Sequence, residues 1–228
     1  MDRMTIQRVY VWQWPVRLYH WVNFLCVVVL CVTGFLIGSP LPIMRAQEAS
    51  FSYWFGTTRF IHFLAGFVFF FNFIFRIYWG FVGNEYARWH NFIPVRRKQL
   101  AEVMEVLRVD ILQAEVQPMD SIGHNALAGW TYFLSFLAFV FQCVTGFGLY
   151  AAMSDAWLPR LFAWIVPLMG GDFAVRQWHH AMMWFFVIFS MAHVYLVFYH
   201  DYVEGRGILS SMGGGWKFVE KECKPENG

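Results

Sequence analysis

Four long apolar segments constrain this chain more than any other feature of its sequence. Each is long enough to cross a hydrocarbon core of about 30 Å as a helix, which takes about 20 residues. Only 14% of the 228 residues are charged, against roughly 25% in an average soluble domain, so the composition argues against a soluble fold. We therefore predict an all-α membrane protein, a four-helix transmembrane bundle built as a single domain over residues 1–228. The expected spans are about 18–37, 60–82, 126–150 and 178–199.

Two shorter segments are expected to form helices outside the membrane core. The apolar run 156–169 is interrupted by Pro159, Arg160 and Pro167, which favours an extra amphipathic helix at the membrane interface. A surface helix is expected at 95–115, in the loop between the second and third spans. The first span is not expected to be a cleaved signal peptide, because its apolar run is too long.

Lys and Arg residues are unevenly divided between the two sides of the predicted bundle. The N-terminus, the 83–125 loop and the C-terminal tail hold 12 of the 17. The opposite side holds Arg45, Arg59, Arg160 and Arg176. Because cytoplasmic loops are enriched in Lys and Arg, both termini are predicted to be cytoplasmic. The net charge of +2 is too small to indicate a nucleic-acid partner.

Two short motifs occur twice in the chain. The sequence Cys-Val-Thr-Gly-Phe occurs at 31–35, late in the first span, and at 143–147, late in the third. Arg-Phe-Ile-His opens the second span at 59–62, and Arg-Gln-Trp-His opens the fourth at 176–179. Odd spans thus match odd spans and even spans match even spans. The repetition indicates either a helical hairpin used twice or similar local packing in two places.

Four histidines fall within the predicted spans, where ionisable side chains are costly and usually functional. His179 and His193 are 14 residues apart, so they lie on one side of their helix, separated by about 21 Å along its axis. His62 begins the second span near the outer face, and His20 begins the first span near the cytoplasm. By depth, His62 therefore pairs with His179, and His20 pairs with His193.

These two pairs predict two bis-histidine haem b sites, one near each face of the bilayer. Neutral imidazole is a common axial ligand of haem iron, and bundle interiors hold such cofactors between facing helices. The sequence contains no Cys-X-X-Cys-His motif, so the haem would be bound non-covalently. The competing interpretation is that single histidines are hydrogen-bonded packing residues.

Three further residues are assigned to these sites. Gly34 lies 14 residues after His20, at the depth of the outer site, and Gly66 lies one turn after His62. A flat macrocycle packed against a helix needs a position that lacks a side chain. Arg76 lies at the depth of the inner site, where it either pairs with a haem propionate or extends to the interface like other helix-end arginines.

The remaining histidines and the cysteines carry weaker signals. His124 begins the third span, which suits a helix-start role or a quinone site. His180 is expected to be a packing or hydrogen-bonding neighbour, and His90 and His200 to be solvated. The cysteines show no metal-ligand spacing, so reduced thiols are expected.

Short motifs at all four predicted spans occur in the order typical of one protein family. They are Val-Arg-Leu-Tyr-His-Trp at 16–21, the segments 32–42, 59–66 and 76–84, Ile-Gly-His-Asn at 122–125, Trp-His at 178–179 and His-Val-Tyr at 193–195. The chain thus resembles the b-type cytochrome subunit of membrane-bound nickel–iron uptake hydrogenases, over nearly its whole length. The wider family includes the cytochrome subunits of formate dehydrogenase and thiosulfate reductase. Met182 departs from the pattern, which has a small residue there.

This resemblance implies a route for electrons through a bacterial cytoplasmic (inner) membrane. A periplasmic hydrogenase splits H₂, and iron–sulfur clusters in its small subunit carry electrons to the membrane. The outer haem on His62 and His179 would accept them, the inner haem on His20 and His193 would follow, and a quinone would be reduced. The chain would anchor the small subunit, and the large subunit through it, without itself splitting H₂.

Three other functions remain compatible with the histidine pattern. One is an anchor for another oxidoreductase, such as formate dehydrogenase. A second is a diffusible cytochrome of the b561 type, which has no permanent partner. A third is a transporter whose histidines relay protons. A haem spectrum distinguishes the transporter from the other two, and co-purification with a dehydrogenase distinguishes an anchor from a diffusible carrier.

Overall fold

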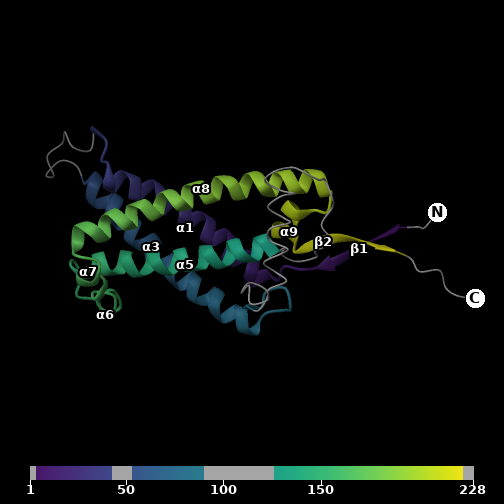
Figure 1. Ribbon diagram of the computed structural model, residues 1–228, viewed down its shortest axis with the longest axis horizontal. Helices are drawn as coiled ribbons and strands as arrows, with labels where there is room; N and C mark the ends of the chain where they lie inside the picture. Colours follow the sequence, from purple (N-terminus) through teal and green to yellow (C-terminus); the bar gives the residue numbers. More distant parts are fainter. Residues whose placement is uncertain (1–3, 43–52, 90–125, 223–228) are drawn as a thin grey trace, which may run out of the picture. The chain divides into compact units, whose positions relative to one another are not determined.

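The computed structural model describes residues 4–42, 53–89 and 126–222. The helix expected at 95–115, together with His90 and His124, lies outside these described residues. The elements are, in chain order, β1 (Met4–Tyr10), α1 (Trp14–Gly38), α3 (Trp54–Val82), α5 (Ala126–Ala151), α6 (Trp157–Arg160), α7 (Ile165–Leu168), α8 (Asp172–Glu204), α9 (Ile208–Gly214) and β2 (Trp216–Glu222) (Figure 1).

Four of these helices, α1, α3, α5 and α8, are long and apolar enough to cross a membrane. Between 11% and 39% of the residues in their spanning segments are buried, so most of their apolar side chains face outward. In water this surface would favour aggregation, whereas in lipid it is the surface that a spanning helix needs. The predicted all-α, four-span membrane fold is therefore confirmed.

Three of the helices begin earlier than their apolar runs do. α1 begins at Trp14 instead of residue 18, α3 at Trp54 instead of 60, and α8 at Asp172 instead of 178. Hydropathy marks the part of a helix that lies in hydrocarbon, but backbone hydrogen bonding continues into the polar interface. Asp172 in the first turn of α8 also favours an early start, because a negative charge stabilises a helix N-terminus.

The predicted interfacial helix is present as two short helices, α6 and α7, joined by a turn. This segment packs on α5. Phe162 stacks on Phe147 with ring centroids 5.6 Å apart, and a Cβ added to Gly148 would lie 2.2 Å from Cγ2 of Ile165. Leu158 is also buried. Some apolar side chains of this segment thus pack against the helices, and others, such as Trp157 and Trp164, are exposed.

The chain divides into two compact units. The first comprises residues 1–18, 76–133 and 192–228, and the second comprises residues 19–75 and 134–191. The single-domain organisation expected from the sequence stays a prediction.

The first unit joins the two ends of the chain through a β-ribbon. β1 pairs with β2 antiparallel, from Met4 opposite Glu222 to Tyr10 opposite Trp216. The rings of Tyr10 and Trp216 lie 4.9 Å apart, and the guanidinium of Arg8 lies 4.3 Å from the Trp216 ring. The ribbon therefore holds Met4 and Glu222 next to each other, as an even number of spans allows.

A small core and a hydrogen-bond network complete the first unit. The core contains Val11, Trp12, Val16 and Ala87. The Asn84 side chain donates to the Val11 carbonyl at 2.9 Å, and the Gln13 side-chain oxygen accepts from the Asn84 backbone at 3.0 Å. These contacts fix the chain where it enters α1 and leaves α3.

The second unit is held together mainly by aromatic side chains between neighbouring helices. Phe139 of α5 stacks on Phe186 of α8, with ring centroids 5.1 Å apart and planes 5° apart. The same Phe139 meets Phe69 of α3 edge-on at 5.0 Å. Further along, Phe67 contacts Phe147, so α3 and α5 run antiparallel. The interior left between these helices contains the candidate site.

Candidate functional site

A cavity of about 910 Å³ lies within the second unit, between α1, α3, α5 and α8. Its volume falls within the roughly 300–1,000 Å³ of ordinary small-molecule and cofactor pockets. Most of the lining is apolar or aromatic. Four residues predicted from the sequence belong to it: His62, His179, Gly34 and Gly66. The structure thus brings the predicted outer histidine pair to one cavity.

His62 is positioned by Thr33 of α1. The Thr33 Oγ1 atom lies 2.8 Å from His62 Nδ1 and 2.6 Å from the Val29 carbonyl oxygen one turn earlier. A hydroxyl has one proton to donate, and the carbonyl can only accept it. The Thr33 oxygen therefore accepts a hydrogen bond from the Nδ1–H of His62. This fixes the tautomer and leaves the Nε2 lone pair available to a metal.

His179 is held in the same way from α5. The Thr145 Oγ1 atom lies 2.8 Å from His179 Nδ1 and 2.7 Å from the Phe141 carbonyl oxygen. Thr145 is fully buried, so no solvent competes for this hydrogen bond. Two copies of one arrangement therefore present two imidazoles in the same protonation state, each with Nε2 unprotonated.

The two imidazoles are spaced as axial ligands of one metal ion would be. Their ring centroids lie 6.4 Å apart. Two metal–imidazole bonds of about 2 Å on opposite sides of an ion give centroids about 6 Å apart. Within the described residues, no group of three or more His, Cys, Asp or Glu side chains could hold a metal ion. A metal held here needs equatorial ligands of its own, which is what haem provides. The residues therefore fit haem.

The glycines of the repeated motif make room for the histidines. A Cβ added to Gly146 would lie 3.1 Å from Cε1 of His179, and one added to Gly34 would lie 3.5 Å from Cε1 of His62. Gly34 was expected to adjoin the macrocycle, but its nearest neighbours include the imidazole itself. A Cβ on Gly66 would meet nothing within 4 Å. Gly66 thus faces open space in the cavity, as expected for a contact with a flat ligand.

The predicted inner pair is divided between the two units, His20 in the second and His193 in the first. Their pairing stays a prediction. Arg76 is buried, and its guanidinium donates to the Ala87 carbonyl at 3.1 Å and lies 5.3 Å from the Tyr132 ring. This places Arg76 in a polar site of its own within the first unit, and its pairing with a propionate also stays a prediction.

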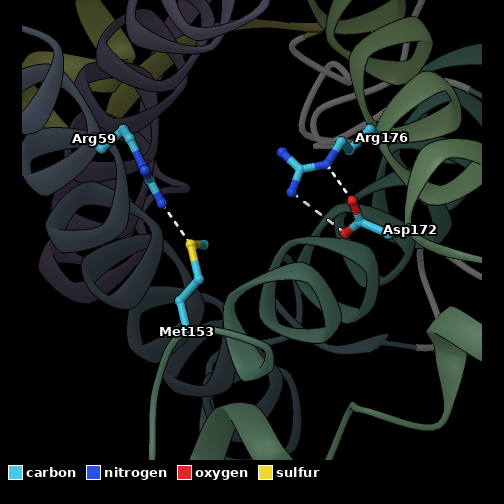
Figure 2. Close-up of polar contacts among 4 residues, drawn as sticks. All are labelled: Arg59, Met153, Asp172 and Arg176. Atoms are coloured by element: carbon cyan, nitrogen blue, oxygen red, sulfur yellow. Dashed lines mark hydrogen bonds and ion pairs between the residues drawn. The ribbon is translucent and has the colours of Figure 1, made fainter.

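Sequence reasoning missed four residues of the outer site. They are Thr33, Thr145, Arg59 and Arg176, of which the two arginines line the cavity (Figure 2). All four belong to the repeated motifs, so the repetition was the signal that could have identified them. His180 also lines the cavity, where its ring packs against Gly38, in line with the packing role expected for it.

Comparison with known proteins places this geometry in a family. The family model described as prokaryotic cytochrome b561 matches residues 11–215. A probable Ni/Fe-hydrogenase B-type cytochrome subunit from Azotobacter vinelandii is 45% identical over 222 residues, covering 96% of this chain and 91% of the relative. The subunit of that name from Cupriavidus necator is 41% identical, covering 93% of this chain and 88% of the relative. A probable Ni/Fe-hydrogenase 1 B-type cytochrome subunit from Escherichia coli is 37% identical, with coverage of 91% and 90%. The chain therefore belongs to the prokaryotic cytochrome b561 family, among the b-type cytochrome subunits of Ni/Fe hydrogenases.

Proposed function

We propose that this chain carries electrons from a periplasmic Ni/Fe hydrogenase across the bacterial inner membrane to a quinone, and anchors that hydrogenase. The observation that supports this most strongly is the pair of histidines, each held by a threonine, that face one cavity at the spacing of axial ligands. The names of the relatives point to the hydrogenase as the partner.

The side chains of the outer site bind and orient the cofactor. When bound, haem b supplies a one-electron centre inside the lipid. His62 and His179 would hold the iron, and the hydrogen bonds from Nδ1 to Thr33 and Thr145 would hold each ring in place and raise its basicity as a ligand. The aromatic lining excludes water, and such burial is one of the means by which a protein sets a haem potential.

The inner site in this proposal is formed by His20 and His193, which gives two haems b per chain. Along α8, His193 lies about 21 Å from His179, and the quinone is reduced on the cytoplasmic side. Arg76 is assigned to a propionate of the inner haem. The excess of Lys and Arg near the joined chain ends supports a cytoplasmic location for both termini.

The hydrogenase is proposed to dock on exposed aromatic residues of the outer face through its small subunit, with the large subunit bound through it. Tyr53, Trp54, Trp157 and Trp164 are all more than half exposed, and we call these four residues the outer aromatic surface. Leu158 is buried and Phe162 stacks on Phe147 of α5, so neither is part of this surface. Aromatic residues also anchor helices at membrane interfaces, so the docking role needs its own test.

The proposal is tested by purifying the chain from membranes in mild detergent and identifying what accompanies it. We expect a Ni/Fe hydrogenase at a fixed ratio, and quinone reduction in the membranes that depends on H₂ and on haem. A complex that contains formate dehydrogenase, and whose haem is reduced by formate but not by H₂, would replace the proposed donor. A folded, purified chain without haem would refute the electron-transfer role itself.

A further inference from the structure

Among the described residues that line the cavity of the second unit, the formally charged ones other than histidine are two arginines, Arg59 and Arg176. Arg59 lies three residues before His62 on α3, and Arg176 lies three residues before His179 on α8. Side chains three apart on a helix are neighbours on its surface. Each arginine therefore lies beside one of the two histidines, on the helix turn that precedes it.

Neither guanidinium is strongly satisfied by the protein groups described. Arg176 is bonded to Asp172 at 2.6 and 3.3 Å, but the two side chains are 55% and 50% exposed, and an ion pair in such surroundings is weak. Arg59 contacts the sulfur of Met153, which is a poor acceptor for a cation. Its guanidinium also lies 5.9 Å from the Phe55 ring and 5.7 Å from the Phe63 ring, and neither ring carries a negative charge. Figure 2 shows the two guanidinium groups projecting inward from facing helices.

The cavity thus combines an apolar interior with two positive charges. A ligand that matches it carries a flat apolar body and two negative groups. Haem b has this chemistry, because its macrocycle is apolar and its two propionates project from one edge. Guanidinium groups bind carboxylates with strong, often bidentate, hydrogen bonds.

We propose that Arg59 and Arg176 each bind one propionate of the haem that His62 and His179 hold. This rests on the proposed function, since it requires haem in the cavity. The two arginines fix the rotation of the macrocycle about the iron, because one carboxylate is held from α3 and the other from α8. Asp172 holds Arg176 at the cavity until a propionate competes for the same guanidinium.

The test uses Arg59→Gln and Arg176→Gln in the intact complex, with Arg160→Gln as the matched control. Arg160 is exposed and, like Arg176, is ion-paired with an aspartate, Asp155, but it does not line the cavity. We expect each cavity variant to weaken haem retention on the order of tenfold or more, and to lower the reduction potential of the outer haem. The potential falls because a lost positive charge no longer stabilises the added electron.

Arg59→Lys is expected to restore the reduction potential more fully than it restores haem retention. Lysine keeps the positive charge but lacks the planar guanidinium that binds a carboxylate with two hydrogen bonds.

A second arm separates propionate binding from a general effect on folding. Membranes from haem-starved cells are reconstituted with iron protoporphyrin IX or with its dimethyl ester. Because the ester carries no carboxylates, the parental chain and the glutamine variants are expected to bind it equally. If the variants bind the ester more weakly to the same degree, the arginines support the fold and the proposal is wrong.

The remaining outcomes are also decisive. If the parental complex holds haem reducible by H₂, and both variants keep parental retention and potential, only the arginine assignment is overturned. If the parental complex holds no haem, the proposed function is refuted, and this inference with it.

Discussion

Thr33→Val provides a direct test of how the outer histidines are held. Valine has nearly the shape of threonine but cannot accept the hydrogen bond from His62 Nδ1, which is 2.8 Å long. The imidazole then becomes a less basic ligand and stabilises the ferric state less. A neutral hydrogen bond contributes about 0.5–1.5 kcal/mol. At about 59 mV per tenfold change for a one-electron couple, loss of that energy from the ferric state raises the potential by about 20–65 mV.

The assay is an anaerobic optical redox titration of the purified complex, which follows the outer haem component. Thr58→Val is the matched control. Thr58 is equally buried, and its hydroxyl likewise donates to the carbonyl one turn earlier, Trp54 O, at 2.9 Å. Within the described residues, its hydroxyl makes no hydrogen bond to a histidine. Thr145→Val is expected to raise the potential similarly through His179. Thr33→Ser should restore the parental value.

Two results would refute this reasoning. One is a potential in Thr33→Val that stays within about 10 mV of the parental value while haem is fully retained. The other is an equal shift of the potential in Thr58→Val. That result would show that the shift comes from losing the hydroxyl's hydrogen bond to the carbonyl one turn earlier, and not from losing the contact with His62.

Three further predictions test the assignment of residues. His62→Ala and His193→Ala are expected to remove different haems, as measured by pyridine haemochrome and low-temperature spectra; loss of both from either variant would contradict the pairing by depth. Gly146→Ala should displace the His179 ring and alter the spectrum of the outer haem, whereas Gly66→Ala should reduce haem affinity without moving a histidine, and equal spectral changes in both would contradict these roles. Serine at all four residues of the outer aromatic surface should release the hydrogenase, as measured by co-purification and by H₂-driven haem reduction; retained hydrogenase at the parental rate would show that these residues only anchor the helices in lipid.

The sequence was sufficient to predict the spans and the outer histidine pair, for physical reasons. A spanning helix must be apolar over a fixed length, so a short stretch of sequence is enough to identify it. The approach of His62 to His179 followed from depth, because each lies near the start of an even-numbered span and therefore near the same face. Helix ends were less well predicted, because a helix can continue beyond the apolar residues that hydropathy detects.

Features that depend on contacts distant in sequence could not be predicted in this way. Pairing of β1 with β2 joins residues more than 200 positions apart in the chain, from Met4 with Glu222 to Tyr10 with Trp216, and neither short strand is distinctive alone. Thr33 and Thr145 looked like ordinary helix residues, and only the fold shows that each contacts a histidine on the next membrane-spanning helix. Gly34 lines the same cavity as His62, but its contact with the imidazole could not be foreseen, because sequence spacing gives depth and direction without identifying what lies opposite.

The central claim is most directly tested by one measurement, the anaerobic absorption spectrum of the intact complex after exposure to H₂, scaled to haem per chain. This account predicts two haems b per chain, both low-spin and both reduced by H₂, with the outer component lost in His62→Ala. Haem b that stays oxidised under H₂ in a complex with active hydrogenase would contradict it.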